Sequence, residues 1–179
     1  MRVIYCVIMI TFFLSCKKED KSKGSEIIVQ ETKDEVIKEV VKDKFIFEAE
    51  VVTDNGGLFY ANFKFDNGTK PINIYKKIIP SKEAQIFKAE IDLKKLDFPS
   101  AMVFYLGKEE AKNVEIRNIH FSSYGNEISF KGNELSNYFV PNSYIKIDSE
   151  LGLVKTIKIN NSHLPTLTLK HKVLDSLLN

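Results

Sequence analysis

Apolar and polar residues alternate along most of this 179-residue chain, and this pattern constrains the fold more than any other feature. In the segment 45–51 every second residue is apolar, beginning with Phe45 and Phe47, so these side chains share one face of an extended strand. No stretch between such segments has a strong helical period. The expected strands are 45–51, 58–65, 72–79, 84–93, 101–106, 114–121, 127–130, 144–148, 154–159 and 164–169, with a final helical turn or tail at 173–178. About ten short strands at this spacing predict an all-β fold, an antiparallel β-sandwich.

Turn residues and one change of phase refine this prediction. Asp54-Asn55-Gly56-Gly57 predicts a hairpin turn, because Asn-Gly accepts the positive φ angles of a type I′ turn. Asp66-Asn67-Gly68 predicts a second turn. Within 114–121 the apolar residues shift by one position, which predicts a β-bulge at Arg117-Asn118.

The cysteine and charge content limit the kinds of site that the folded part can hold. Cys6 and Cys16 are the only cysteines, so no disulfide, cysteine-ligated zinc site or cysteine nucleophile is possible after residue 16. Lysine and arginine total 26 against 24 acidic residues, and only Arg2 and Arg117 are arginines. Because arginine is the residue best suited to bidentate phosphate contacts, nucleic acid is not an expected partner.

The first sixteen residues have the pattern of a membrane address. Arg2 precedes an apolar run at 3–14, which is too short for the ~20 residues of a membrane-spanning helix. The run ends at Ser15-Cys16 and turns abruptly polar. This pattern resembles the bacterial lipoprotein signal in the form common in Bacteroidota, in which the residue three before the cysteine, here Phe13, varies. An uncleaved signal anchor, or a secreted protein in which Cys16 has no role, are the alternatives.

The resemblance implies a signal peptide at 1–15 and lipidation of Cys16. The cysteine thiol would take a diacylglycerol, and the new amino group an acyl chain such as palmitate, which together make a stable anchor. The implied location is the bacterial outer membrane. Lys18-Glu19-Asp20 resembles the signal that exports some of these lipoproteins to the cell surface, although a periplasm-facing attachment stays open.

Residues 16–43 are predicted to form a charged tether, and residues 44–179 the folded domain. The 28 residues from Lys17 to Lys44 include eight lysines and eight acidic residues, and none of the 28 is aromatic. Such a stretch cannot bury a core. A partial apolar stripe predicts a few helical turns. The alternative, a dimerising coiled coil, requires three or four heptads, and this stretch holds fewer than two.

A family resemblance extends over most of the domain. The strand Leu58-Phe59-Tyr60-Ala61-Asn62-Phe63 is followed by a segment of the form V-x-I-x-x-I-x-F at 114–121 and by a helical-turn segment at 134–139. These features resemble the galactose-binding-like jelly roll, and in particular modules attached to bacterial glycosyltransferases and membrane polysaccharide proteins. Those modules often carry an Arg-x-Asp-Pro turn where Leu106-Gly107-Lys108-Glu109 stands here. The resemblance therefore implies a fold more than an activity.

Residues with catalytic or metal-binding chemistry do not form a recognisable set. The three histidines, His120, His163 and His171, lack the spacing that brings two imidazoles to one metal ion, and no serine stands in a G-x-S-x-G turn. No cofactor is expected and the chain is not expected to be an enzyme. The Asp-Asn-Gly turns at Asp54 and Asp66 are the candidate positions for a structural calcium ion, with turn geometry as the simpler explanation.

Tyrosine is the residue type most suggestive of a ligand, because aromatic rings stack on sugars and the hydroxyl tolerates water. The candidate ligand-binding residues are Tyr60, Tyr75, Tyr105 and Arg117. The sequence thus predicts a membrane-anchored lipoprotein with a non-catalytic recognition domain for a glycan or an envelope protein. The alternatives are an accessory subunit of an envelope complex without a small ligand, or tyrosines that serve only packing.

Overall fold

The computed structural model describes residues 43–179, so the predicted signal peptide, Cys16 and the tether up to residue 42 lie outside the described residues. The elements, in chain order, are β1 (Lys44–Thr53), β2 (Gly57–Lys64), β3 (Ile72–Ile78), β4 (Ser81–Asp92), β5 (Ala101–Tyr105), β6 (Asn113–Ser123), β7 (Asn126–Lys131), η1 (Gly132–Glu134), α1 (Leu135–Tyr138), β8 (Phe139–Pro141), β9 (Ile145–Asp148), β10 (Leu153–Thr156), β11 (Thr166–Leu169) and α2 (His171–Leu178). No helix of this described part is long and apolar enough to cross a membrane.

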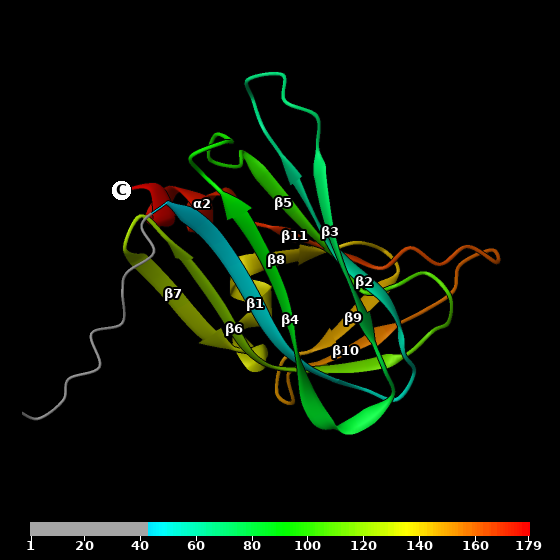
Figure 1. Cartoon of the computed structure of the whole chain (residues 1–179). Coiled ribbons are helices and arrows are strands. Elements are labelled where there is room, and N and C mark those ends of the chain that lie inside the picture. The colour runs from blue at the N-terminus through cyan, green and yellow to red at the C-terminus, as the bar shows by residue number, and fades with distance from the viewer. Residues whose placement is uncertain (1–42) are drawn as a thin grey trace, which may run out of the picture. The chain divides into compact units, whose positions relative to one another are not determined.

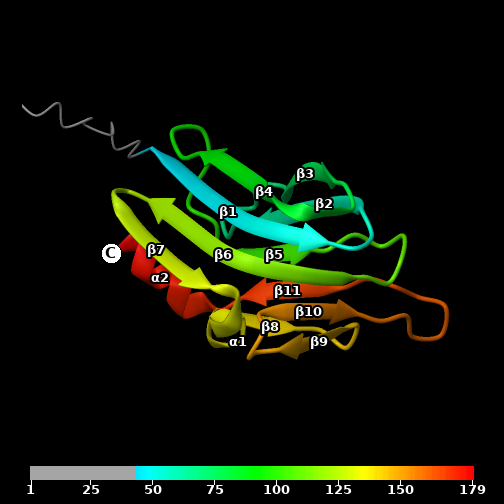
Figure 2. The same ribbon diagram turned by 90° about the horizontal axis from the view of Figure 1, so that it is seen from below.

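The strands form two sheets that pack face to face (Figures 1 and 2). Sheet A has the order β4-β1-β6-β10-β9, with β7 paired to the second half of β6, and sheet B has the order β3-β2-β5-β11-β8. Every strand pair is antiparallel. The prediction of an all-β antiparallel sandwich is confirmed.

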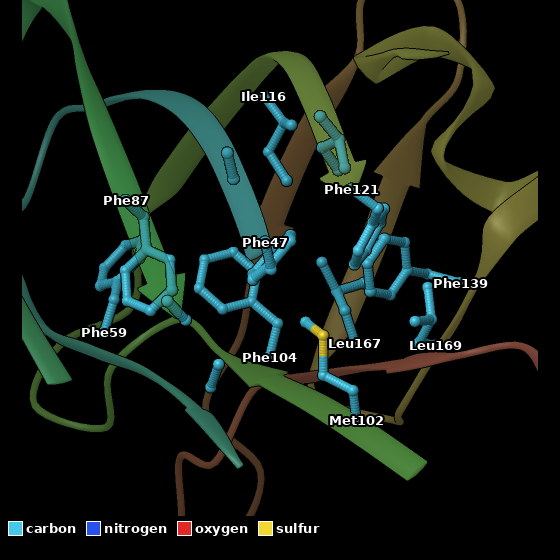
Figure 3. Close-up of a cluster of buried hydrophobic side chains, with 14 of the residues drawn as sticks. Phe47, Phe59, Phe87, Met102, Phe104, Ile116, Phe121, Phe139, Leu167 and Leu169 are labelled. Atoms are coloured by element: carbon cyan, nitrogen blue, oxygen red, sulfur yellow. The ribbon is translucent and has the colours of Figure 1, made fainter. Parts of the chain in front are cut away.

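The core fills the space between the sheets and consists largely of phenylalanine. Figure 3 shows Phe47 at its centre, with Phe87 and Phe121 from sheet A and Phe104 from sheet B around it. Ring centroids lie 5.8 Å from Phe47 to Phe87, 5.1 Å to Phe104 and 4.9 Å to Phe121. Each fully buried phenylalanine contributes roughly 1.5–3 kcal/mol by leaving water. One ring therefore joins both sheets.

The alternation read from the sequence places the core residues correctly. Phe45, Phe47, Ala49 and Val51 are buried, and the residues between them, such as Glu48, face outward. The predicted bulge is confirmed by the register of β1 against β6, in which Glu50 is opposite Asn118 and Val51 is opposite Ile116. Arg117 is thus the extra residue that restores the phase of the following strand.

The predicted hairpin at residues 54–57 is wrong. β1 belongs to sheet A and β2 to sheet B, so this segment carries the chain between layers. Neither Asn55 nor Gly56 has a positive φ angle. Instead the Asp54 carboxylate accepts hydrogen bonds from the backbone N and the Nδ2 of Asn113, at 2.8 and 2.6 Å, which ties the segment to the start of β6. By contrast, residues 66–68 do close the β2–β3 hairpin, with Gly68 at a φ of +82°.

The structure adds elements at the C-terminal side of the chain. The helical turn expected near residues 134–139 is present as η1 and α1, and the short strand β8 follows it without having been predicted. The predicted final turn is the longer helix α2, which buries Val173, Leu174 and Leu177. It lies beside β7 at one end of sheet A (Figure 2). Because α2 presents these residues at helical spacing, it closes that end of the core.

Candidate ligand-binding site on the outer face of sheet B

Three of the predicted site residues form a row across the outer face of sheet B. Tyr60 of β2 is directly opposite Tyr75 of β3 on one side and Tyr105 of β5 on the other. Their neighbours in sequence, Phe59 and Phe104, point into the core, so strand alternation turns all three tyrosines outward. Tyr75 is exposed, whereas Tyr60 and Tyr105 are half-buried. The tertiary structure thus gathers tyrosines that lie up to 45 positions apart in the sequence.

The tyrosine rings are stacked against one another. The rings of Tyr60 and Tyr105 are 4.0 Å apart at their centroids and only 10° from parallel. Rings this close lie face to face, because rings side by side in one plane would collide at that distance. Tyr75 lies 5.0 Å from Tyr60 on its other side, tilted by 36°. The row therefore presents ring edges and hydroxyl groups outward, and Tyr60 has a neighbouring ring on each side.

This packing changes the acidity of the central phenol. Burial, followed by the proximity of Tyr105 and Tyr75, raises the pKa of Tyr60 to about 12. Both effects disfavour the phenolate, because a charge there would lose hydration and lie beside other phenols. Tyr60 is therefore uncharged at neutral pH, and its hydroxyl group remains both a donor and an acceptor.

A hollow of about 170 Å³ lies beside the tyrosine row. Its walls come from three strands and two loops: Leu58 and Tyr60 of β2, Tyr75 of β3, Tyr105 of β5, residues Gly107, Lys108 and Glu109 after β5, and Leu164 and Pro165 before β11. Leu58, Tyr75 and Leu164 expose 44%, 53% and 44% of their surface. Three large apolar or aromatic side chains are thus exposed around one hollow, which makes it the candidate binding surface.

One end of the hollow is polar. Gly107 has a φ of +81°, and a Cβ atom there would lie 3.0 Å from both the Oε2 of Glu109 and the Nζ of Lys112. A side chain at this position would therefore be strained and would meet both charged groups. Glu109 itself is exposed, and among the described residues its carboxylate forms no hydrogen bond or ion pair within the protein. Its oxygens are free to accept hydrogen bonds from a ligand.

Behind Glu109 lies the buried lysine Lys112, which the sequence analysis missed. Only 3% of its surface is exposed. Its ammonium group donates a 2.7 Å hydrogen bond to the carbonyl of Gly56 and lies 5.4 Å from the centre of the Phe59 ring. Burial lowers the pKa of Lys112, and the charge of Glu109 opposes that shift. Nothing in the sequence marks this lysine, because lysines are rarely buried and loop packing alone encloses it.

The buried backbone of Lys112 is anchored to the loop before β11. The Oγ1 of Thr156 accepts a 2.8 Å hydrogen bond from the backbone N of Lys112 and lies 3.0 Å from the Nε2 of His163. His163 is buried and directly precedes Leu164, one wall of the hollow. These contacts connect the two loops that border the hollow.

An amide pair extends the polar surface next to the tyrosines. Asn62 lies two residues beyond Tyr60 and opposite Asn73, which lies two residues before Tyr75. The Nδ2 of Asn62 donates a 2.8 Å hydrogen bond to the Oδ1 of Asn73. The remaining amide donors and acceptors face outward beside the aromatic row, where a ligand hydroxyl group can meet them.

The structure does not bring Arg117 to the tyrosines. Arg117 lies in β6 of sheet A, in the opposite layer. Its Nε donates a 2.8 Å hydrogen bond to the Oε1 of Glu115, and this contact raises the pKa of Arg117. The candidate set therefore divides into a tyrosine row in one sheet and a surface ion pair in the other.

Larger depressions on the outer face of sheet A hold groups that already bond to one another. A hollow of about 270 Å³ is bordered by Glu50, Asn118 and His120, but Asn118 donates to Glu50 and the Nδ1 of His120 lies 2.9 Å from the Oγ of Ser129. A hollow of about 420 Å³ contains Asp54, whose two oxygens are bonded to Asn113. In these two depressions, Asp54, Glu50, Asn118 and His120 are therefore already engaged within the protein.

Metal-binding chemistry is not assembled in the part of the chain that the structure describes. In residues 43–179 no three histidine, aspartate or glutamate side chains group in a way that could hold a metal ion. The carboxylate of Asp54 already accepts hydrogen bonds from Asn113. Asp66 lies in the β2–β3 hairpin turn, where the side chain of Asn67 donates a hydrogen bond to Asp97.

Comparison with known proteins returns no family model, no curated protein and no solved structure that matches this chain. The function is therefore inferred from the residues and geometry of the chain itself.

Proposed function

We propose that this protein is a lipid-anchored envelope lipoprotein whose β-sandwich binds a glycan on the outer face of sheet B. The observation that carries the proposal is the row of Tyr60, Tyr75 and Tyr105 beside a small hollow with free polar groups at its end. A sugar has one face of C–H groups and a rim of hydroxyl groups, so it needs an apolar wall and polar partners together.

The residues around the hollow meet both needs. Leu58, Tyr75 and Leu164 supply exposed apolar surface for the C–H groups of a sugar. Glu109 and the tyrosine hydroxyl groups supply hydrogen-bond acceptors and donors at the hollow. The amide pair of Asn62 and Asn73 lies on the same face, beyond the tyrosine row and outside the hollow. A purely apolar partner would leave these groups without hydration or a hydrogen bond, which is unfavourable.

The anchoring half of the proposal is supported by the sequence. A signal peptide at 1–15 and a lipid on Cys16 would hold the domain at the outer membrane through the tether at 16–43. Lys18-Glu19-Asp20 supports display at the cell surface, where the domain would meet polysaccharide directly. Replacement of Cys16 by serine should abolish incorporation of a labelled palmitate analogue and release the protein from the membrane fraction.

A glycan array tests the binding half. The full chain is purified in a detergent without a sugar headgroup and applied with and without calcium. We expect saturable binding to one glycan class, which Tyr75→Ala removes and Ile86→Ala leaves unchanged. Ile86 is the matched control because it is exposed to a similar degree, 54% against 53%, but lies on sheet A.

Two results would contradict the proposal. A folded chain that binds no glycan would redirect the search to a protein partner, to be captured by cross-linking in the native envelope. Binding that Ile86→Ala weakens and Tyr75→Ala spares would place the site on the other sheet.

A further inference from the structure

The geometry points to a narrower class of ligand. We infer that the hollow binds the single terminal sugar of a glycan chain and that the Glu109 carboxylate accepts hydrogen bonds from the hydroxyl groups of that sugar. This inference rests on the proposed glycan-binding function. It excludes the other common arrangement, in which an open platform binds an internal stretch of polysaccharide.

The orientation of the tyrosine rings argues against an open platform. Binding of several consecutive sugars requires aromatic faces that are turned toward solvent one after another. Here Tyr60 lies between two rings, and the face of Tyr105 toward Tyr60 is covered at a centroid distance of 4.0 Å. Tyr75, at the edge of the row and 53% exposed, is the most exposed of the three tyrosines. One well-exposed ring suits one sugar better than a series of consecutive sugars.

The size and walls of the hollow lead to the same conclusion. Its volume of about 170 Å³ is well below the roughly 300–1,000 Å³ of pockets for drug-sized ligands. The tyrosine row borders it on one side, while the loop of Gly107 and Glu109 and the loop of Leu164 border it elsewhere. An internal sugar would require the glycan chain to enter the hollow on one side and leave it on another. A terminal sugar requires only one opening of the hollow.

Glu109 supplies the polar contact at the end of the hollow. A carboxylate has two oxygens and accepts hydrogen bonds from two adjacent hydroxyl groups, and hydrogen bonds to charged groups are the stronger kind. The ammonium of the buried Lys112 approaches the same glycine position as Glu109, at 3.0 Å from the Cβ that Gly107 lacks. Lys112 thereby acts as a positioning residue, because its positive charge attracts the carboxylate of Glu109 and holds it near the hollow.

Calorimetry with ligands of increasing length tests this inference on the full chain. The probes are the monosaccharide, disaccharide and hexasaccharide of each glycan that binds on the array, again in a detergent without sugar. We expect the hexasaccharide to bind within about threefold of the monosaccharide, since later sugars add few contacts. Blocking the terminal sugar of the hexasaccharide should abolish binding.

Glu109→Gln should weaken binding by about tenfold or more, because it replaces a charged hydrogen-bond acceptor with a neutral one. Glu110→Gln is the matched control, since Glu110 is the next residue but pairs with Lys158 at 3.1 Å and does not border the hollow. The comparison of glycans of different length uses the unmodified protein. It therefore tests the inference even if the Glu109→Gln variant does not fold.

The outcomes separate the two proposals. Affinity that rises steeply with chain length, or that survives Glu109→Gln in a folded variant, overturns the terminal-sugar inference and leaves glycan binding intact. Absence of binding to every array glycan overturns both.

Discussion

The outer faces of the two sheets differ sharply, although their inner faces share one core. Sheet A carries a ladder of opposite charges, with Lys88 3.0 Å from Glu48 and Lys44 paired with Glu90. Across β3, β2 and β5, sheet B instead carries stacked tyrosines and an amide pair. Along β1 and β4 of sheet A these charges pair with one another, whereas sheet B exposes aromatic and polar groups side by side.

This difference supports the proposal that sheet B carries the binding face. Exposed ion pairs contribute only about 0–1 kcal/mol each, so the ladder on sheet A serves hydration more than stability. Exposed aromatic and apolar side chains that gather beside a hollow are instead typical of an interaction site. The contrast leads to four predictions, of which the first three are ordered by the size of the expected effect.

Truncation of the core that both sheets share should destabilise the two sheets together. Phe47→Ala deletes a ring that contacts Phe87, Phe104 and Phe121, so we expect a loss of about 3–5 kcal/mol in the free energy of unfolding. Urea denaturation followed by circular dichroism measures this loss. A decrease below about 1 kcal/mol would mean that the sheets do not depend on this ring.

Removal of the central tyrosine should destabilise sheet B. Tyr60→Ala deletes two aromatic pairs of about 0.5–1.5 kcal/mol each, so we expect a loss of about 1–3 kcal/mol by the same measurement. Tyr60→Phe keeps the ring and should retain most of the stability. If Phe and Ala destabilise equally, the hydroxyl group and not the stack stabilises the row.

Removal of the central lysine of sheet A should have a smaller effect that depends on salt. Lys88 is within 3.0 Å of Glu48 and 3.9 Å of Glu90, so Lys88→Ala should cost less than about 1 kcal/mol. The cost should shrink further near 1 M salt, where charges are screened within about 3 Å. Tyr60→Ala serves as the control, because its effect should not diminish with salt. A salt-independent cost at Lys88 would contradict the ion-pair explanation.

The fourth prediction concerns alkaline pH. Tyr60 keeps its proton in the folded state up to a pKa of about 12, against an ordinary value of 10.0. Between these values the unfolded chain releases this proton first, so the free energy of unfolding should fall as the pH rises across that window. Ultraviolet titration of phenolate should show one late-ionising tyrosine, absent in Tyr60→Phe. Ionisation of Tyr60 together with exposed tyrosines would contradict the proposed packing.

Local pattern was enough to predict most strands and the direction of their side chains. Because strand residues alternate sides, the burial of Phe59 and Phe104 already implied that Tyr60 and Tyr105 face outward. The phase shift near Arg117 revealed the bulge for the same reason. These features depend on neighbouring residues in the chain, so they can be predicted from the sequence.

Which strands become neighbours was decided only by tertiary packing. Asn55-Gly56 predicted a hairpin, yet β1 pairs with β4 and β6, whereas β2 pairs with β3 and β5 in the other layer. The same long-range choice placed Tyr75, Tyr60 and Tyr105 in one row, left Arg117 on the opposite sheet and enclosed Lys112 between loops. The sequence by itself determined strand content and facing, because these arise from local geometry. Sheet partners and the hollow required the structure, because they arise from contacts between residues far apart in the chain.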